Sequence, residues 1–357
     1  MVPICLRWPK YQMHILVLGY CVCVGSLILA SFATKVWHLM LTQGVLYGVG
    51  WVICYTPFLI LLNQWWIKRR GLAYGIIYGA SGITGLILPF ILDALLARFG
   101  FRITLCAYAV ATVVLSGPGI LLIKPRIPPS MLAKESAKDR AYNDTDMKKN
   151  DPSMLRNPLF HLHNLATLLQ GLAFFFPPTF LPSFASALSL PSSTGDVLLA
   201  INALAQVSGQ LTLGFASDII SPSIPPTMSA VVTGLAVFLL WGPAKSMLFL
   251  SLFSALWGFF AGSYSVLWTQ IAAELATGRA DKEAMTMYIY GVFSFLRGVA
   301  SILEGPLSAM MLGEKEDVNF YGLQKWKAIV VFTGVTLILA SVASMAAWLL
   351  VRMTRKR

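Results

Sequence analysis

Residues 12–33 read QMHILVLGYCVCVGSLILASFA, a run of 22 residues that contains no Asp, Glu, Lys or Arg. A helix needs about 20 apolar residues to cross about 30 Å of hydrocarbon. Because a bilayer offers the backbone no hydrogen-bond partners, a run of this length predicts a transmembrane helix. The run follows Arg7 and Lys10 and lacks a clear small-residue cleavage site. We therefore interpret it as a retained helix rather than a removable signal peptide.

Nine further apolar runs follow, and the composition agrees with them. The chain is 57% hydrophobic and only 12% charged, about half the charged fraction of soluble domains. The pattern predicts an all-α polytopic membrane protein. The ten expected spans are 12–33, 38–63, 72–96, 103–123, 159–185, 196–216, 227–242, 246–270, 285–311 and 327–351.

The net charge of +12 reflects topology rather than nucleic-acid binding. If the N-terminus is cytosolic and the spans alternate, 19 of the 27 Lys and Arg residues lie in cytosolic segments. This is the positive-inside bias of membrane proteins. We therefore expect both termini in the cytosol, a lipid bilayer around the protein and no nucleic-acid partner. A central contribution comes from the cluster Lys68, Arg69 and Arg70.

Only residues 124–158 have a composition typical of a soluble segment. They are rich in charge, Pro and Ser and too poor in apolar residues to fold alone. The expected domains are an N-terminal four-helix half-bundle (1–123), a disordered cytosolic linker (124–158) and a C-terminal six-helix half-bundle with a short basic tail (159–357).

Arg297 is the most informative single side chain, because a cation in the middle of a span costs about 2.5–3.5 kcal/mol on insertion scales. Its planar guanidinium suits bidentate binding of a carboxylate. Glu304 is seven positions on, about 10 Å along the helix, which is too far for a direct ion pair. We expect Arg297 to contact an anionic substrate, with Glu304 or Asp93 as proton carrier. The alternative is an internal ion pair of Arg297, for instance with Asp93.

Polar residues also recur at helical spacing inside the span 196–216. Asn202, Gln206 and Gln210 form a stripe at i, i+4 and i+8. Such a stripe lines a substrate path about as often as it joins helices by hydrogen bonds. Together with Tyr288, these residues are candidate substrate contacts, although aromatic packing is the simpler interpretation of the tyrosine.

Residues that distort or tighten helices cluster in the same spans. Pro177 and Pro178 remove backbone donors well inside the fifth span and predict a broken helix. Irregular backbone at that depth is tolerated only inside protein or beside a watery cavity. Gly79 and Gly82 belong to a set of small residues whose spacing is typical of tight helix packing.

The sequence offers little for catalysis or cofactor binding. No phosphate-binding glycine motif is present, and the many Ser residues have no accompanying His and Asp. His161 and His163 have no third ligand in view, and we interpret them as a solvated or interfacial pair. We expect no enzyme activity, no cofactor and no metal site.

Four stretches carry a resemblance to a known family. Residues 65–85 read WWIKRRGLAYGIIYGASGITG, which resembles the segment of monocarboxylate transporters where an aromatic-x-K-R-R sequence leads into a Gly/Ala-rich fifth helix. Residues 171–188 (GLAFFFPPTFLPSFASAL) resemble the broken seventh helix of fungal members. Residues 209–220 (GQLTLGFASDII) resemble the loop signature between helices eight and nine of the major facilitator superfamily. Residues 278–309 resemble the region of helices ten and eleven, including its arginine.

The resemblance implies a major facilitator bundle with ten of the usual twelve helices, in a 4+6 arrangement that lacks helices one and two. It assigns a gating role to Asp218, together with Lys68, Arg69 and Arg70. In the superfamily signature, basic residues usually follow this aspartate, and here they are replaced by Ile219-Ile220-Ser221-Pro222. The aspartate–arginine pair of animal relatives on helix eight is also missing, so Arg297 would take over anion binding.

The function implied is proton-coupled transport of a small monocarboxylate or similar organic anion by alternating access. One alternative keeps the fold and makes the cargo an exported fungal secondary metabolite. The other is a truncated membrane protein that does not transport. The expected location is the plasma membrane, with the vacuolar membrane as the alternative. Substrate, direction, coupling ion and oligomeric state are left open.

Overall fold

The computed structural model describes residues 5, 8–66, 68–128, 154, 156–191, 193–277, 282–313, 318–319 and 322–354. Apart from one antiparallel pair of two-residue strands, β1 (Val318–Asn319) and β2 (Gly322–Leu323), the regular elements of these residues are helices. The predicted linker 124–158 falls largely outside the described residues. The all-α expectation is confirmed.

The chain forms two compact units. The first comprises residues 1–67 and 87–151, and the second comprises residues 68–86 and 152–357. The segment 68–86 therefore packs with the C-terminal helices, whereas the sequence placed it in an N-terminal half-bundle of residues 1–123. The assignment of half-bundles remains a prediction.

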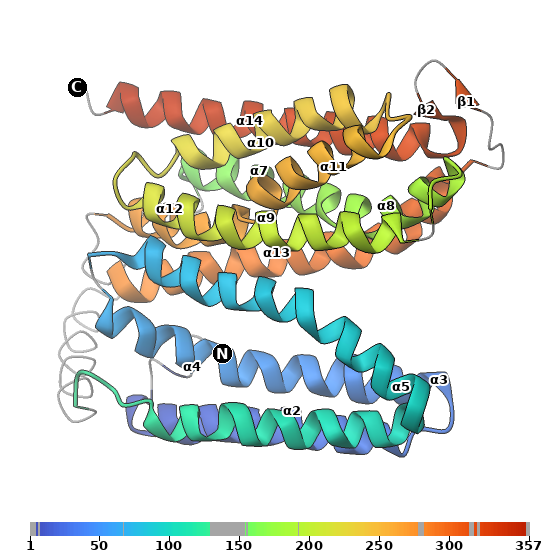
Figure 1. Ribbon diagram of the computed structural model, residues 1–357. Coiled ribbons are helices and arrows are strands. Elements are labelled where there is room, and N and C mark those ends of the chain that lie inside the picture. Colours follow the sequence, from blue (N-terminus) through green and yellow to red (C-terminus); the bar gives the residue numbers. More distant parts are fainter. Residues whose placement is uncertain are drawn as a thin grey trace. The chain divides into compact units, whose positions relative to one another are not determined.

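In the first unit, α2 (Gln12–Ser31) packs along α4 (Tyr47–Trp65), as Figure 1 shows. The helices approach closely at Gly50, where an added Cβ would lie 2.9 Å from the backbone nitrogen of Cys23. The Tyr20 hydroxyl donates a 3.0 Å hydrogen bond to the Thr112 carbonyl oxygen. The shorter elements of this unit are η1 (Pro9–Tyr11), α3 (Val36–Leu39) and the π-helix η2 (Met40–Leu46).

The long element α5 (Arg70–Leu122) is two helices joined at a sharp turn. Gly100 has φ +72° and ψ 172°, a backbone conformation that favours glycine, and the chain reverses there (Figure 1). Gly100 lies between the expected spans 72–96 and 103–123, so the sequence placed this turn correctly.

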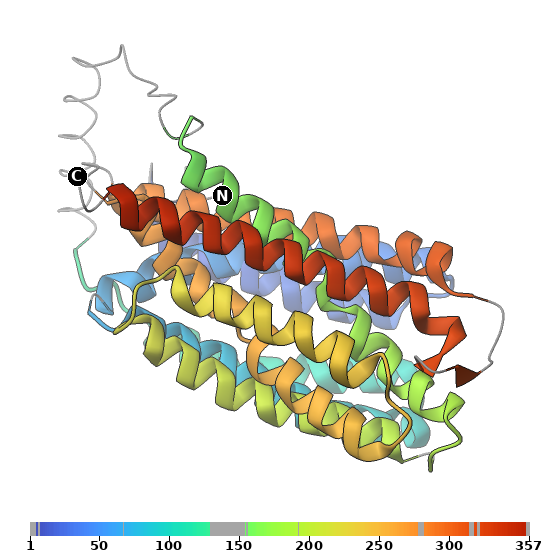
Figure 2. The ribbon, with the colours of Figure 1, turned by 90° about the horizontal axis from the view of Figure 1, so that it is seen from above.

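The second unit contains the first part of α5 and the C-terminal helices. Within it, α14 (Lys327–Thr354) packs against both α7 (Pro158–Phe174) and α10 (Ile224–Ala236), and α7 also packs on α13 (Lys282–Met311), as Figures 1 and 2 show. Its further elements are α7 (Pro158–Phe174), α8 (Phe176–Ala187), α9 (Thr194–Ser217), α10 (Ile224–Ala236), η3 (Val237–Trp241), α11 (Met247–Leu256), η4 (Trp257–Ala261), η5 (Tyr264–Leu267), α12 (Trp268–Leu275), α13 (Lys282–Met311), η6 (Gln324–Trp326) and α14 (Lys327–Thr354).

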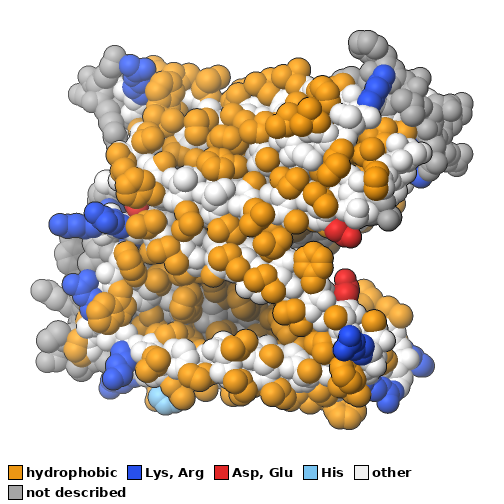
Figure 3. Space-filling model, viewed as in Figure 1, with side chains coloured by type: hydrophobic (Ala, Val, Ile, Leu, Met, Phe, Trp, Pro, Cys, Tyr) orange, Lys and Arg blue, Asp and Glu red, His pale blue; other side chains and the backbone are white. Residues whose placement is uncertain are grey.

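Ten helical segments in the described residues are long and apolar enough to cross a membrane. They match the ten expected spans to within a few residues, except around Gly100. Figure 3 shows apolar side chains over the flanks of the helices, with Lys and Arg near the helix ends. This distribution is the one that lipid around the flanks and water at the ends require.

The predicted break in the fifth span is present. The helix α7 ends at Phe174, Phe175 lies between the two helices, and α8 begins at Phe176 with Pro177 and Pro178 in its first turn. Neither proline has an N–H to donate to the preceding turn, so the α7 ladder ends there.

A second irregular region lies where α11 continues into η4. The residues of η4 form a π-helix, in which the Gly262 N–H donates to the Trp257 carbonyl at 3.2 Å. Three successive carbonyl oxygens then accept side-chain hydrogen bonds from three different helices. Ser229 of α10 donates to Phe260 at 2.9 Å, Gln170 of α7 to Ala261 at 3.4 Å and Gln210 of α9 to Gly262 at 3.3 Å. We call residues 260–262 the carbonyl hub.

Gly209 tests the packing of α9 against this region. A Cβ at Gly209 would overlap the Phe259 carbonyl oxygen, which belongs to the backbone and cannot rotate away. We expect Gly209→Ala to lower the free energy of unfolding by about 1–3 kcal/mol, the usual cost of overpacking. Thermal unfolding of the purified protein in detergent measures it, with Gly48→Ala as control because a Cβ there meets open space. Equal melting temperatures for the two variants would contradict this packing.

Candidate functional site

Arg297 lies midway along α13, and its partners are neutral. Its Nη1 donates to the Gln170 Oε1 at 2.5 Å, and its Cζ lies 3.7 Å from the centroid of the Phe174 ring. The Phe175 ring is 5.5 Å away. Among the described residues, the one ion pair joins Arg70 and Glu283, so no described carboxylate lies within ion-pair distance of Arg297. Arg297 is half-buried, and none of these residues compensates its charge.

The side chains of Tyr78, Tyr264 and Glu304, of the same unit, lie in the wider surroundings of Arg297. Tyr264 is buried, and the side chains of Thr167 and Ser344 lie beside its hydroxyl. Glu304 is 8% exposed and makes no ion pair with Arg297, as its spacing on the helix predicted. The surroundings of the guanidinium are therefore hydroxyls, one amide, aromatic rings and one distant carboxyl.

The polar stripe of α9 lies against the helix that carries the carbonyl hub. A Cβ at Gly258 would lie 2.9 Å from the Asn202 Oδ1, and one at Gly262 would lie 2.7 Å from the Gln206 Cγ. Gln210 is 1% exposed and donates to the hub. This geometry favours the helix-joining interpretation of Asn202, Gln206 and Gln210, and a substrate contact by them remains a prediction.

Two other candidates, Tyr288 and Asp93, make no described contact with Arg297. Tyr288 is 51% exposed, whereas Tyr290, two residues on, is 6% exposed and faces the interior of the unit. Asp93 is exposed and belongs to the first unit.

Asp218, just after α9, binds the beginning of α5. Its carboxylate accepts hydrogen bonds from the backbone N–H groups of Gly71 at 2.8 Å and Leu72 at 2.9 Å, and from the Gln270 Nε2 at 2.5 Å. The first N–H groups of a helix lack partners within the helix, and the helix dipole favours a negative charge there. Asp218 therefore caps α5 from another helix.

Small residues make this contact between α5 and α9 possible. An added Cβ at Gly71 would overlap the Gly214 carbonyl oxygen, and one at Gly75 would overlap the Gln210 carbonyl oxygen. At Gly82 it would lie 2.7 Å from Val207, whereas Gly79 has room for it, with the nearest atoms at 3.9 Å. Tight packing by the predicted glycines holds at Gly82 but not at Gly79.

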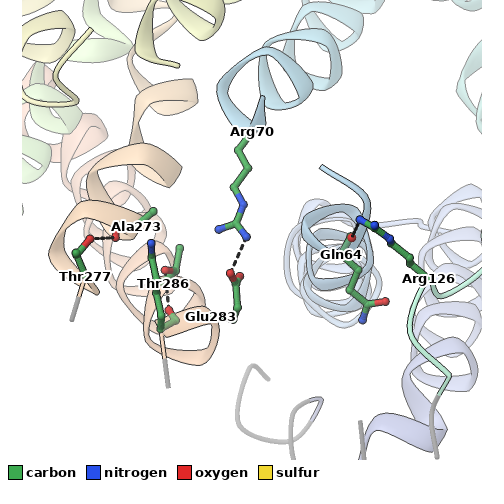
Figure 4. A network of polar contacts seen from close by, with 8 residues as sticks. Gln64, Arg70, Arg126, Ala273, Thr277, Glu283 and Thr286 are labelled. Atoms are coloured by element: carbon green, nitrogen blue, oxygen red, sulfur yellow. Dashed lines mark hydrogen bonds and ion pairs between the residues drawn. The ribbon is translucent and has the colours of Figure 1, made fainter. Parts of the chain in front are cut away.

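Two polar contacts join α5 to α13. Near the beginning of both helices, the Arg70 Nη2 lies 2.7 Å from the Glu283 Oε1, as Figure 4 shows. Two turns further along, the hydroxyls of Tyr78 and Tyr290 are 2.5 Å apart. Because Glu283 is 62% exposed, the ion pair is worth at most about 1 kcal/mol. Lys68 and Arg69 are exposed.

Several groups around Arg297 were not predicted from the sequence, and one histidine was misjudged. The groups not predicted are Gln170, Phe174, Tyr78 and Tyr264. His163, expected to be solvated or interfacial, is 3% exposed, because α7 packs on both α13 and α14. The polar residues His163, Thr167 and Gln170 at i, i+4 and i+7 were the available signal for a buried polar face.

Within the part of the chain that the structure describes, no three His, Cys, Asp or Glu side chains gather as metal ligands would. The arrangement is instead that of a bundle of membrane-spanning helices with a partly exposed cation in its interior. This is the organisation of a multi-pass integral membrane protein.

Comparison with known proteins identifies the class. Residues 4–303 match the family model described as Major Facilitator Superfamily, so the chain belongs to that superfamily. A mutant of the nucleoside transporter NupG has the same fold, with a TM-score of 0.64 at 13% identity, over 97% of this chain and 86% of that one.

Three curated relatives share similar levels of identity with the chain. "MFS-type transporter 1" of Ophiocordyceps sp. is 25% identical and covers 92% of this chain and 69% of its own length. "Monocarboxylate transporter 12" of Rattus norvegicus is 25% identical over 83% and 65%. "Agnestins efflux protein AgnL12" of Paecilomyces divaricatus is 25% identical over 93% and 73%. Across eight curated relatives, the match covers between 62% and 73% of the relative's own length.

Asp218→Ala removes both backbone hydrogen bonds at the beginning of α5. We expect a loss of about 1–2 kcal/mol in the stability of this helix end, the usual effect of losing a cap. Hydrogen–deuterium exchange of the peptide that contains Gly71 and Leu72 should become faster. Asp196→Ala serves as control, because Asp196 is an exposed residue in the first turn of α9. Unchanged exchange at residues 71–72 would mean that the carboxylate does not cap α5.

Proposed function

We propose that this chain is a secondary transporter that moves a small organic anion together with a proton by alternating access. The observation that carries the proposal is the partly exposed Arg297, whose described partners are all neutral. A cation inside the bilayer normally faces the bundle interior and pairs with another charge. A transported carboxylate supplies that charge, and the guanidinium can bind its two oxygens through parallel N–H donors.

Glu304 is the better candidate for the proton carrier. It lies on the same helix as Arg297, is 8% exposed, and has no basic partner within ion-pair distance among the described residues. A carboxyl in such surroundings can take up and release a proton without breaking an ion pair. Asp93, the other candidate, is exposed.

The contacts of α5 form a gate at the end of the unit where Arg70 lies. Asp218 holds the beginning of α5 to α9, and the pairs Arg70–Glu283 and Tyr78–Tyr290 hold α5 to α13. Each contact is polar and can be exchanged for water, so the helices can separate at modest cost. The break at Phe175, followed by Pro177 and Pro178, serves as a hinge between α7 and α8. Opening one end while the other is closed is the alternating-access cycle.

Export of a larger metabolite is the second candidate, and the relatives favour it. One of them is named an agnestins efflux protein, and another, from Gibberella fujikuroi, a fujikurins efflux protein. The rings of Phe174 and Phe175 beside Arg297 would suit an apolar or aromatic cargo that carries an acid group. Both candidates require the same cation, so uptake assays should include small and aromatic acids.

The proposed setting follows from the charge distribution. We place both termini and the end of α5 that carries Lys68, Arg69 and Arg70 in the cytosol, with the plasma membrane as the expected location. The gate described above would then be cytosolic.

Arg297→Ala should abolish anion uptake without abolishing membrane insertion. The measurement is uptake of radiolabelled pyruvate, and in parallel benzoate, into proteoliposomes with an inward proton gradient. We expect a loss of at least tenfold, because the guanidinium that binds the carboxylate is missing. Arg102→Ala is the control, since Arg102 is an exposed residue of the first unit. Full uptake by Arg297→Ala would refute the assignment.

Glu304→Gln should separate anion movement from proton movement. The amide keeps the shape and polarity of the carboxyl but cannot carry a proton between the two sides. We therefore expect uptake driven by a pH gradient to fall at least tenfold while exchange of labelled for unlabelled anion continues. Loss of both activities, or retention of gradient-driven uptake, would remove Glu304 from the coupling role.

A further inference from the structure

Gln170 joins the carbonyl hub to Arg297 through one side chain. It is 1% exposed and lies one turn before the end of α7. Its Nε2 donates to the Ala261 carbonyl at 3.4 Å, and its Oε1 accepts from the Arg297 Nη1 at 2.5 Å. A reversed amide would place two acceptors together at Ala261 and two donors together at Arg297. The two partners therefore determine which amide atom faces the arginine.

The orientation of Gln170 depends on the π-helix η4. In a regular α-helix the Ala261 carbonyl would accept from an N–H four residues on, but here η4 ends at Ala261 and the 3-10 helix η5 follows at Tyr264. The carbonyl accepts instead from Gln170 of another helix. The amide is thereby fixed with its oxygen toward the guanidinium.

The approach of α7 to α13 is tight at this point. A Cβ at Gly171 would lie 2.8 Å from the Ala300 Cβ and 3.3 Å from the Arg297 Cδ. The Phe174 ring covers one face of the guanidinium at 3.7 Å. A ligand therefore has to reach the N–H donors at the edge of the guanidinium plane, where the Gln170 oxygen already binds.

We propose that Gln170 is an internal stand-in for the carboxylate of the transported anion, which the anion displaces when it binds Arg297. This inference rests on the proposed function and adds to it a specific role for Gln170. An amide oxygen accepts the same hydrogen bond as a carboxylate oxygen but carries no net charge. A carboxylate makes the stronger, bidentate contact and displaces the Gln170 oxygen when it is present. When it is absent, Gln170 keeps one of the guanidinium N–H donors bonded while the empty transporter changes its facing state.

Two predictions about transport follow from this role. Without Gln170, the anion binds Arg297 with no competitor, so its affinity rises. At the same time, the empty transporter has to change its facing state while Arg297 lacks its hydrogen bond to Gln170, so this return step becomes slow. Net uptake needs the empty return step, whereas exchange of one anion for another does not.

The test compares Gln170→Ala and Gln170→Glu with the wild type, using radiolabelled benzoate and pyruvate in proteoliposomes. We expect Gln170→Ala to lower the Kd of the labelled anion at least threefold and to reduce net uptake at least tenfold while exchange is retained. Gln170→Glu should lose anion binding at pH 7.5, because its charged carboxylate occupies Arg297, and should recover binding when that carboxyl is protonated at low pH.

Ser229→Ala is the matched control, since Ser229 donates to the neighbouring hub carbonyl of Phe260 and makes no described contact with Arg297. It should lower thermal stability without changing the ratio of net uptake to exchange. Weaker anion binding in Gln170→Ala, or an equal loss of net uptake and exchange, would overturn the stand-in role and leave the proposed function intact. If neither anion binds the wild type, or Arg297→Ala binds them equally well, both proposals fail.

Discussion

The backbone of a membrane-spanning segment has to satisfy its own hydrogen bonds, and at the carbonyl hub side chains of other helices meet that requirement instead. At residues 260–262, three successive carbonyl oxygens accept from Ser229, Gln170 and Gln210, each on a different helix. A hydrogen bond in such surroundings is costly to leave unmade. The hub thus fixes α7, α9 and α10 around one point, and through Gln170 it fixes the partner of Arg297.

The proposed gate and Arg297 share the helix α13. The helix α13 carries Glu283 and Tyr290, which contact α5, and also Arg297, which contacts α7. Tyr78 of α5 pairs with Tyr290, which lies on the same helix as Arg297. In the proposed mechanism, anion binding at Arg297 would reach the contacts that hold α5 through this shared helix.

Much of the fold could be predicted from the sequence, because the bilayer imposes length and composition on each span. The break at Pro177 and Pro178 was also visible, since proline constrains the backbone directly, and the turn at Gly100 lies in the gap between two expected spans. The π-helix at residues 257–261 was not visible, because its formation depends on the neighbouring helices that satisfy its carbonyls.

The same distinction applies to the site. Arg297 stood out because a cation is rare in an apolar span, but the polar face that Gln170 shares with His163 and Thr167 does not reveal which group the Gln170 amide contacts. Gln170 could be recognised only once α7, α13 and the hub were placed together. His163 was misjudged for the same reason, since its position near a helix end indicated an interface while the packing of α7 on α13 and α14 buries it.

No carboxylate among the described residues neutralises Arg297. An experimental structure of the purified full-length protein without added anion, determined by electron cryomicroscopy in a lipid nanodisc, tests this most directly. The account predicts Gln170 and Phe174 as the partners of the guanidinium, with no Asp or Glu side chain in ion-pair contact. A map in which Asp93, Glu304 or any other carboxylate of the chain is bound to Arg297 would contradict it.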